Sequence, residues 1–323
     1  MELSIVIPIY KIRDYVVKCV ESCIDNDVIN DYEIILVDDE SPDDSIDLLQ
    51  PYIQKYDNIS LVQRKNGGLS SARNSGLDVA KGYYVWFVDG DDYIEPDAIK
   101  IVLQTIKEHK CDIYLLGYNS VVDDKIVDST IFKVGEGIVN PHKEFLKCNF
   151  SFPALVWTHV YNRQYLVDNN LRFYEGIIYE DTEFKFNSYY LASTLFSIEK
   201  SLYNYRIGRP GSIMTTSEKK LKEGISSRIL AINKFLLDCT KYSVPTNVKD
   251  EYLSDLSLLS IELIFEQKTE IIKQHKQIIK NLLPYLVKTR NKKRKIFSRL
   301  CAILPNIIFK YLLSFYKKHL IKS

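Results

Sequence analysis

Several features that mark other classes of protein are missing from this 323-residue sequence. Its 12 glycines and 10 prolines are too few for a low-complexity or collagen-like chain. Its six cysteines include no CxxC pair and no cluster with histidine, which disfavours a zinc site. We therefore expect free, buried cysteines, as in a protein of the reducing cytosol.

Long apolar runs are also missing. No stretch of about 18 uncharged apolar residues occurs, so we expect no transmembrane helix. The most apolar candidate, residues 296–316, is interrupted by Arg299, Pro305 and Lys310. Residues 3–9 are apolar but lack a basic flank, so we expect no signal peptide.

Two nucleotide-binding motifs are absent as well. No GxGxxG follows the first predicted strand, which argues against a typical dinucleotide site. No GxxxxGK[ST] occurs either, which excludes a P-loop. The five histidines show no metal-ligand spacing.

The charge is unevenly distributed along the chain. The net charge is +1, but residues 271–323 hold 14 Lys and Arg and no acidic residue. Residues 1–270 keep the other 29 basic residues and all 42 acidic ones, a net charge of −13. A basic C-terminal segment indicates an anionic partner, either a membrane or a nucleic acid.

The first 120 residues alternate strand and helix signals, which predicts an α/β fold with a mostly parallel sheet. Strands are expected at 3–9, 33–37, 59–63, 83–88 and 113–117, and helices at about 14–24, 44–56, 69–80 and 96–109. Residues 118–215 are less regular, with a hairpin around 121–134 and a helix at 181–191. Helices are expected at 218–239, 247–267 and 270–288, after a linker at 206–217.

Ligands of such sheets bind at the carboxyl ends of the strands. The residues there are Pro8 and Tyr10 after the first strand, Asp38 and Asp39 after the second, and Asp89, Asp91 and Asp92 after the fourth. Asp89 and Asp91 are two residues apart, so both carboxylates face one side of an extended segment. Mg²⁺ or Mn²⁺ takes one or two carboxylates together with substrate phosphate oxygens. The alternative is a solvated acidic turn.

Seven segments of the chain form an ordered set of motifs. Four lie within the first 95 residues: LSIVIPIY (3–10), YEIILVDDESPDDS (32–45), NGGLSSARNSG (66–76) and VWFVDGDD (85–92). Three come later: ALVWTHVYNR (154–163), YEDTEF (179–184) and YNYRIGRPGSI (203–213). In order and spacing this set resembles the family 2 glycosyltransferases of the GT-A fold, and the resemblance covers about residues 1–215.

The resemblance assigns expected roles on the donor side. Asp89-Gly90-Asp91 matches the DXD motif, with Asp91 as the direct metal ligand and Asp89 nearer the sugar and ribose. Asp38 or Asp39 would bind the nucleobase, consistent with uracil, and Pro8 and Tyr10 would line the base and ribose pocket.

Two further roles concern the transfer itself. Arg73 would face the diphosphate or the sugar, and Asp181 matches the catalytic base, which removes the proton of the acceptor hydroxyl. Glu180 and Asp181 would otherwise only place favourable charge at a helix N-terminus, and Arg73 would only form a structural ion pair. Arg206 and Arg209 could close over phosphate or belong to a plain linker, and Trp157 and Tyr161 could stack on a sugar or belong to the core.

The C-terminal segment suggests a membrane surface. A basic run, residues 288–295, precedes an apolar segment that would form an amphipathic helix kinked at Pro305. The alternative is a helix folded onto the body with a solvated basic face. Nucleic acid is disfavoured because no reading module is visible.

Taken together, the sequence predicts three regions: a nucleotide-sugar-binding half (1–117), an acceptor-binding half (118–215), and a helical region (216–323) with the basic tail (288–323). We expect an inverting, metal-dependent glycosyltransferase that uses a UDP-sugar and a lipid-linked oligosaccharide of capsule or similar polysaccharide. It would be cytoplasmic and peripheral on the inner face of the cell membrane. The alternatives are a degenerate nucleotide- or glycan-binding partner protein and a sugar-nucleotide nucleotidyltransferase.

Overall fold

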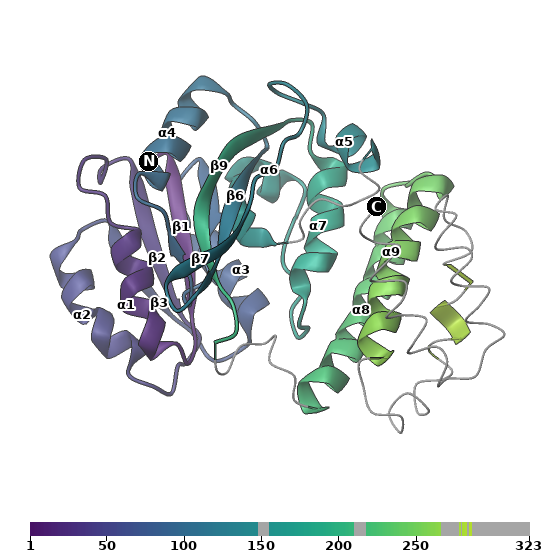
Figure 1. The fold of residues 1–323 in the computed structure, drawn as a ribbon, viewed down its shortest axis with the longest axis horizontal. Helices are drawn as coiled ribbons and strands as arrows, with labels where there is room; N and C mark the ends of the chain where they lie inside the picture. Colours follow the sequence, from purple (N-terminus) through teal and green to yellow (C-terminus); the bar gives the residue numbers. More distant parts are fainter. Residues whose placement is uncertain (148–154, 210–217, 266–277, 279, 283, 286–323) are drawn as a thin grey trace. The chain divides into compact units, whose positions relative to one another are not determined.

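A computed structural model describes the chain apart from residues 148–154, 210–217, 266–277, 279, 283 and 286–323 (Figure 1). The chain divides into two compact units. The first contains residues 1–176 and 180–215, and the second contains residues 177–179 and 216–323. The basic tail at 288–323 and the helix expected at 270–288 therefore lie wholly or largely outside the described residues.

The first unit is built on one mixed sheet. Its strands are β1 (Leu3–Ile9), β2 (Tyr32–Asp38), β3 (Ile59–Gln63), β4 (Tyr84–Phe87), β5 (Tyr93–Ile94), β6 (Ile113–Val122), β7 (Lys125–Thr130), β8 (His159–Asn162) and β9 (Leu195–Arg206). Their order in the sheet is β3-β2-β1-β4-β8-β6-β9-β5, and β7 pairs with β6.

The N-terminal half of this sheet is parallel, and the rest is mixed. β1 pairs in parallel with both β2 and β4, and β2 pairs in parallel with β3. β8 then runs antiparallel between β4 and β6, while β9 is parallel to β6. The expected α/β fold is confirmed, and the buried runs of β1 and β2 explain the central position of these strands.

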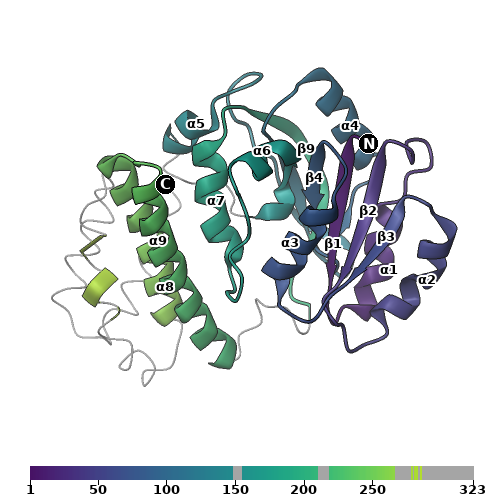
Figure 2. The same cartoon turned by 180° about the vertical axis from the view of Figure 1, so that it is seen from behind.

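Helices of the first unit cover both faces of the sheet. They are α1 (Arg13–Ser22), α2 (Ser45–Lys55), α3 (Leu69–Val79), α4 (Ala98–Glu108), α5 (Pro141–Lys147), α6 (Arg163–Asp168) and α7 (Glu180–Leu191). The two views place α1 and α3 on opposite faces of the parallel half (Figures 1 and 2). Gly76 lets α3 lie close to the sheet, because a Cβ there would clash with Val6 and approach Val37 Cγ2 to 3.2 Å.

Four cysteines belong to the cores of their units, as expected. Cys19, Cys23, Cys111 and Cys239 are buried and free. Burial raises the pKa of Cys111 to about 11 and that of Cys239 to about 12. These thiols therefore stay protonated at neutral pH and behave as small apolar side chains.

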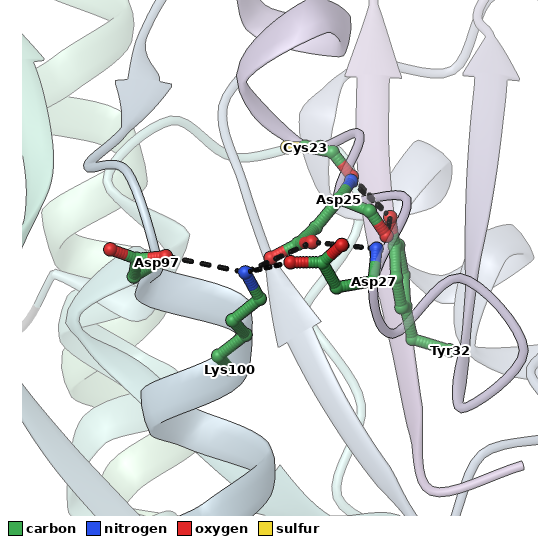
Figure 3. A network of polar contacts seen from close by, with 6 residues as sticks. All are labelled: Cys23, Asp25, Asp27, Tyr32, Asp97 and Lys100. Carbon is green, nitrogen blue, oxygen red and sulfur yellow. Dashed lines mark hydrogen bonds and ion pairs between the residues drawn. The ribbon is translucent and has the colours of Figure 1, made fainter.

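A polar network ties the segment after α1 to the start of α4 (Figure 3). Lys100 Nζ lies 2.6 Å from Asp27 Oδ2, 3.5 Å from Asp97 Oδ1 and 3.6 Å from Asp25 Oδ1. The hydrogen bond from Lys100 lowers the pKa of Asp27. Beneath it, the Tyr32 hydroxyl accepts from the Asp25 amide and donates to the Cys23 carbonyl, at 2.7 and 3.0 Å. This network holds a surface loop beside the first residue of β2, whereas the strand-end acid Asp38 is the last residue of that strand.

The second unit is helical in its described part. It contains α8 (Glu218–Lys241) and α9 (Thr246–Phe265), which pack through residues such as Phe235 and Tyr252, with ring centroids 4.9 Å apart. The Ile178 amide donates to Ser227 Oγ at 3.0 Å, which attaches residues 177–179 to α8. The helices expected at 218–239 and 247–267 are therefore confirmed.

Candidate active site

The parallel register brings the ends of β1, β2 and β4 together. Pro8 lies opposite Val37 and Ile9 opposite Asp38, while the Val88 amide donates to the Val6 carbonyl at 2.9 Å. The loop that follows β4 therefore starts beside the end of β1. Gly90 makes this approach possible, because a Cβ at this position would lie 2.8 Å from the Pro8 carbonyl oxygen.

The loop after β4 carries a cluster of three carboxylates. One oxygen from each of Asp89, Asp91 and Asp92 lies within 4.8 Å of the others. Asp89 and Asp91 are partly exposed, whereas Asp92 is only 1% exposed. Burial first, and then repulsion between the carboxylates, raises the pKa of both Asp91 and Asp92. The cluster is therefore a place where added positive charge is favoured.

Arg73, on α3, is a fully buried cation between two carboxylates. Its Nη2 lies 2.7 Å from Asp89 Oδ1, and its Nη1 lies 2.5 Å from Glu180 Oε1 in the first turn of α7. Its side chain is 1% exposed. Burial alone would lower the pKa of Arg73, but Asp89 and Glu180 outweigh it and the pKa is raised. Arg73 thus stays charged and connects the β4 loop to α7.

Asp181 lies beside this bridge, at the start of α7. No side-chain hydrogen bond to its carboxylate is found among the described residues. Burial and the neighbouring Glu180 raise the pKa of Asp181 to about 7, and Arg73 acts in the opposite direction. The carboxylate can therefore exchange a proton near neutral pH, which is what a general base requires.

Asp91 and Asp92, the other two acids of the cluster after β4, have their partners on β9 and just after it. Arg209 Nε pairs with Asp91 Oδ2. Asp92 accepts from the Tyr203 hydroxyl and from the Arg206 amide, each at 2.8 Å. Tyr203 was missed by the sequence reading, although it lies in a segment, 203–213, that carries the family resemblance.

The acids after β2 have mainly local partners. Asp39 Oδ1 lies 2.5 Å from Arg64 Nη1, and the amides of Gly67 and Gly68 donate to its two oxygens at 3.0 and 2.8 Å. Asp38 accepts from the Ser41 amide at 2.8 Å. Both carboxylates thus shape the loops that follow β2 and β3.

The residues predicted after β1 differ in exposure. Pro8 is buried within β1, whereas the Tyr10 ring is 43% exposed and lies 5.0 Å from Lys11 Nζ. Tyr10 is therefore the accessible member of the pair.

Trp157 and Tyr161, which could have stacked on a sugar or belonged to the core, are buried. Trp157 and Tyr161 are each 2% exposed, and the Trp157 ring stacks on Tyr203 and Tyr205. Their place is the core beneath the site. Arg206 packs over the Tyr93 ring at 4.8 Å and pairs with Asp124 at 2.6 Å.

The carboxylate cluster retains two oxygens that fit a divalent cation. Asp92 uses both oxygens in hydrogen bonds, and Asp89 Oδ1 and Asp91 Oδ2 are engaged by arginines. Within the described part of the chain, Asp89 Oδ2 and Asp91 Oδ1 keep no such partner. Two hard oxygens from separate carboxylates match the preference of Mg²⁺ or Mn²⁺ for few protein ligands and several water or phosphate oxygens.

A parallel strand core with acids at its strand ends and an antiparallel continuation is the architecture of the GT-A glycosyltransferases. The structure of residues 1–349 of TarS from S. aureus in complex with UDP-GlcNAc is similar to this one, with a TM-score of 0.73 and 21% identity over 98% of this chain and 92% of that chain. The family model "Glycosyl transferase family 2" matches residues 4–150. The chain belongs to the family 2 glycosyltransferases.

Glycosyltransferases of several bacteria are similar to this chain in sequence. Glycosyltransferase GlyG of Streptococcus pneumoniae is 30% identical over 66% of this chain and 73% of its own length. The poly(ribitol-phosphate) beta-glucosyltransferase of Bacillus spizizenii is 33% identical over 67% of this chain but 34% of its own length. The uncharacterized glycosyltransferase EpsJ of Bacillus subtilis is 31% identical, and the match spans 60% of its length.

Among the residues that the structure describes, no helix is both long enough and apolar enough to cross a bilayer.

Proposed function

We propose that this protein is a glycosyltransferase that moves a sugar from a UDP-sugar to a hydroxyl of a cell-surface polysaccharide or its lipid-linked precursor. The observation that carries this proposal is the Arg73 bridge. It connects Asp89, in the acidic loop after β4, to Glu180, next to Asp181 on α7. One buried cation thus connects the loop that carries the proposed metal ligands to the helix that carries the proposed base.

The relatives support the donor and the acceptor class. TarS was crystallised with UDP-GlcNAc and with UDP. One relative is a poly(ribitol-phosphate) beta-glucosyltransferase, and another, GgaB of Bacillus subtilis, is a minor teichoic acid biosynthesis protein. We therefore propose a UDP-sugar as the donor and a cell-surface polymer or its precursor as the acceptor.

On the donor side, Asp91 would be the direct ligand of Mg²⁺ or Mn²⁺, and Asp89 would lie nearer the sugar and ribose. A bound divalent cation would neutralise the charge that develops on the departing diphosphate. Arg209, which pairs with Asp91 here, would turn toward phosphate when the donor binds.

The nucleobase would lie against the ends of β1 and β2. Tyr10 is exposed enough to stack on it, and Pro8 forms the floor of that pocket in our proposal. Asp38 or Asp39 would accept from the uracil imide. Since Asp39 already binds Arg64 and two amides, Asp38 has the larger remaining capacity to accept.

On the acceptor side, Asp181 would take the proton of the attacking hydroxyl. The acceptor oxygen forms a bond to the anomeric carbon, the bond from that carbon to the diphosphate oxygen breaks, and the proton goes to Asp181. A single in-line displacement of this kind inverts the anomeric centre. In this scheme residues 1–117 bind the donor and residues 118–215 contribute the acceptor side.

The cellular location we propose follows from the charge of the tail. Residues 271–323 hold 14 basic and no acidic residues. Such a segment would hold the protein on the anionic inner face of the cell membrane, where lipid-linked acceptors are presented.

A donor screen tests the proposal. The full chain is incubated with a panel of UDP- and GDP-sugars and Mn²⁺, and release of the nucleoside diphosphate is measured. We expect UDP from one UDP-sugar, and a loss of at least about 100-fold in the Asp91→Asn and Asp181→Asn variants. Asp123→Asn, at an exposed hairpin turn, is the matched control and should keep full activity.

The alternative is a degenerate partner protein that binds nucleotide or glycan without transfer. It would bind UDP and Mn²⁺ in calorimetry but release no UDP from any donor with any acceptor. The presence of Asp89, Asp91 and Asp181 together favours the enzyme, because a protein that only binds nucleotide or glycan has no need of a proton-accepting carboxylate.

A further inference from the structure

The hydroxyl of Tyr203 is bound on both sides by the acidic loop. It donates to Asp92 Oδ2 at 2.8 Å and accepts from the Asp89 amide at 3.1 Å. One hydroxyl on β9 therefore connects the first and last residues of the Asp89–Asp92 segment, which includes both proposed metal ligands.

Asp92 differs from the other two acids of the cluster. Its second oxygen accepts from the Arg206 amide at 2.8 Å, so both oxygens are already in use. It is 1% exposed, whereas Asp89 and Asp91 are partly exposed. The cluster thus consists of two acids that can reach a cation and one that anchors the loop to β9.

The position of the Tyr203 ring is fixed by its surroundings. The residue is fully buried, and its ring stacks on Trp157 with centroids 4.4 Å apart and planes 14° from parallel. Its backbone lies in the sheet, opposite Ile94 of β5 and Tyr118 of β6. Burial and the neighbouring Asp92 raise its pKa, so the hydroxyl keeps its proton and can donate.

We propose that Tyr203 and Asp92 are positioning residues for the divalent-cation site. They hold the loop after β4 in the conformation in which Asp89 and Asp91 present their remaining oxygens on one side. Groups that orient metal ligands without touching the metal change its affinity about 10- to 100-fold when removed. This inference rests on the proposed function, because it needs a cation at Asp89 and Asp91.

The test is the variant Tyr203→Phe, which removes the hydroxyl and keeps the ring on Trp157. Mn²⁺ binding to the full chain is measured by titration with electron paramagnetic resonance, with Mn²⁺ alone and again with UDP. We expect the Mn²⁺ dissociation constant to rise about 10-fold or more. In a transfer assay, kcat should recover at saturating Mn²⁺ while the half-saturating Mn²⁺ concentration stays high.

Tyr205→Phe is the matched control. Its ring stacks on the same Trp157, at 5.2 Å, and no hydrogen bond of its hydroxyl is found among the described residues. It should bind Mn²⁺ like the wild type. If Tyr203→Phe does not fold, Asp92→Asn replaces it and is judged by the same criterion.

The outcomes separate this inference from the proposed function. If the wild type binds Mn²⁺ and both Tyr203→Phe and Asp92→Asn bind it equally well, the positioning role is refuted and the metal site stands. If the wild type itself binds no Mn²⁺ with or without UDP, the metal site is refuted, and the inference with it.

Discussion

Asp181 illustrates how burial and two charged neighbours set the pKa of one carboxylate. Burial raises its pKa most, Glu180 raises it further, and Arg73 lowers it, with a result of about 7. An acid with an ordinary pKa would be deprotonated throughout the physiological range but would be a weak base. In the proposed reaction, the raised pKa would make Asp181 a better proton acceptor and would make the transfer sensitive to pH.

This sensitivity gives the first prediction. Asp181 must lose its proton before it can accept one from the acceptor, so kcat/KM should rise as the pH increases through about 7. The profile is measured with saturating Mn²⁺ between pH 5.5 and 9, a range set by the assay. A profile that is flat down to about pH 5 would contradict the assignment. Asp168→Asn, an exposed acid on α6, should leave the profile unchanged.

At the scale of elements, α3 and α7 are joined to the β4 loop through Arg73. The two ion pairs of Arg73 connect residues at positions 73, 89 and 180, which no local pattern relates. The sequence predicted α3 and the acidic loop well, because each is a local signal: a helix rich in small residues, and acids directly after a buried strand. It left Arg73 between a contact with the donor and a structural ion pair, and it could not name Glu180 as the partner because this pairing exists only after α7 has packed.

The sequence did not predict strands β8 and β9. β8 has four residues, too few for an alternating pattern to be distinguished from a loop, and it lies between β4 and β6. β9 was missed because its buried and exposed positions do not alternate regularly, as the register shifts against β6 also show. The five strands and four helices expected in residues 1–117 were found because each carries a continuous apolar run or a helical apolar face.

The second prediction concerns the Arg73 bridge. Arg73→Met leaves the buried Glu180 and the partly exposed Asp89 without their cation, which should reduce the free energy of unfolding by about 3–5 kcal/mol. Because Arg73 lowers the pKa of Asp181, the pH at half-maximal kcat/KM should move upward in the variant. Urea unfolding and the pH profile measure the two effects.

The control for this prediction is Arg172→Met. Arg172 pairs with Asp78 at 2.7 Å, but the two side chains are 38% and 58% exposed. Exposed pairs contribute little, so stability should change by less than about 1 kcal/mol and the pH profile should not move. Equal losses in both variants would show that the burial of Arg73 has no special consequence.

For the whole molecule, the charge of the chain is divided between an acidic part and a basic end. The acids of the β4 loop and α7 contribute to the net −13 of residues 1–270, and residues 271–323 carry +14. The acidic part serves the proposed chemistry with a cation. The basic end would instead decide where that chemistry takes place.

The third prediction tests that division. A chain ending at residue 287 should bind vesicles containing phosphatidylglycerol much less than the full chain, since each basic residue near an anionic surface contributes about 1 kcal/mol. Co-sedimentation measures the bound fraction, and phosphatidylcholine vesicles are the control. A full-length variant with Lys292, Lys293, Arg294 and Lys295 changed to Glu should lose binding in the same way. Unchanged binding of both variants would refute a membrane role for the tail.

The place of β8 in the sheet has a consequence for synthesis on the ribosome. β4 ends at Phe87, but its partner on that side, β8, begins only at His159. At about 5–20 residues per second, the edge of β4 stays open for several seconds while a strand with the sequence YVWF waits for its neighbour. An unpaired apolar edge can join another chain. The nascent protein should therefore be most dependent on chaperones between the emergence of β4 and that of β8.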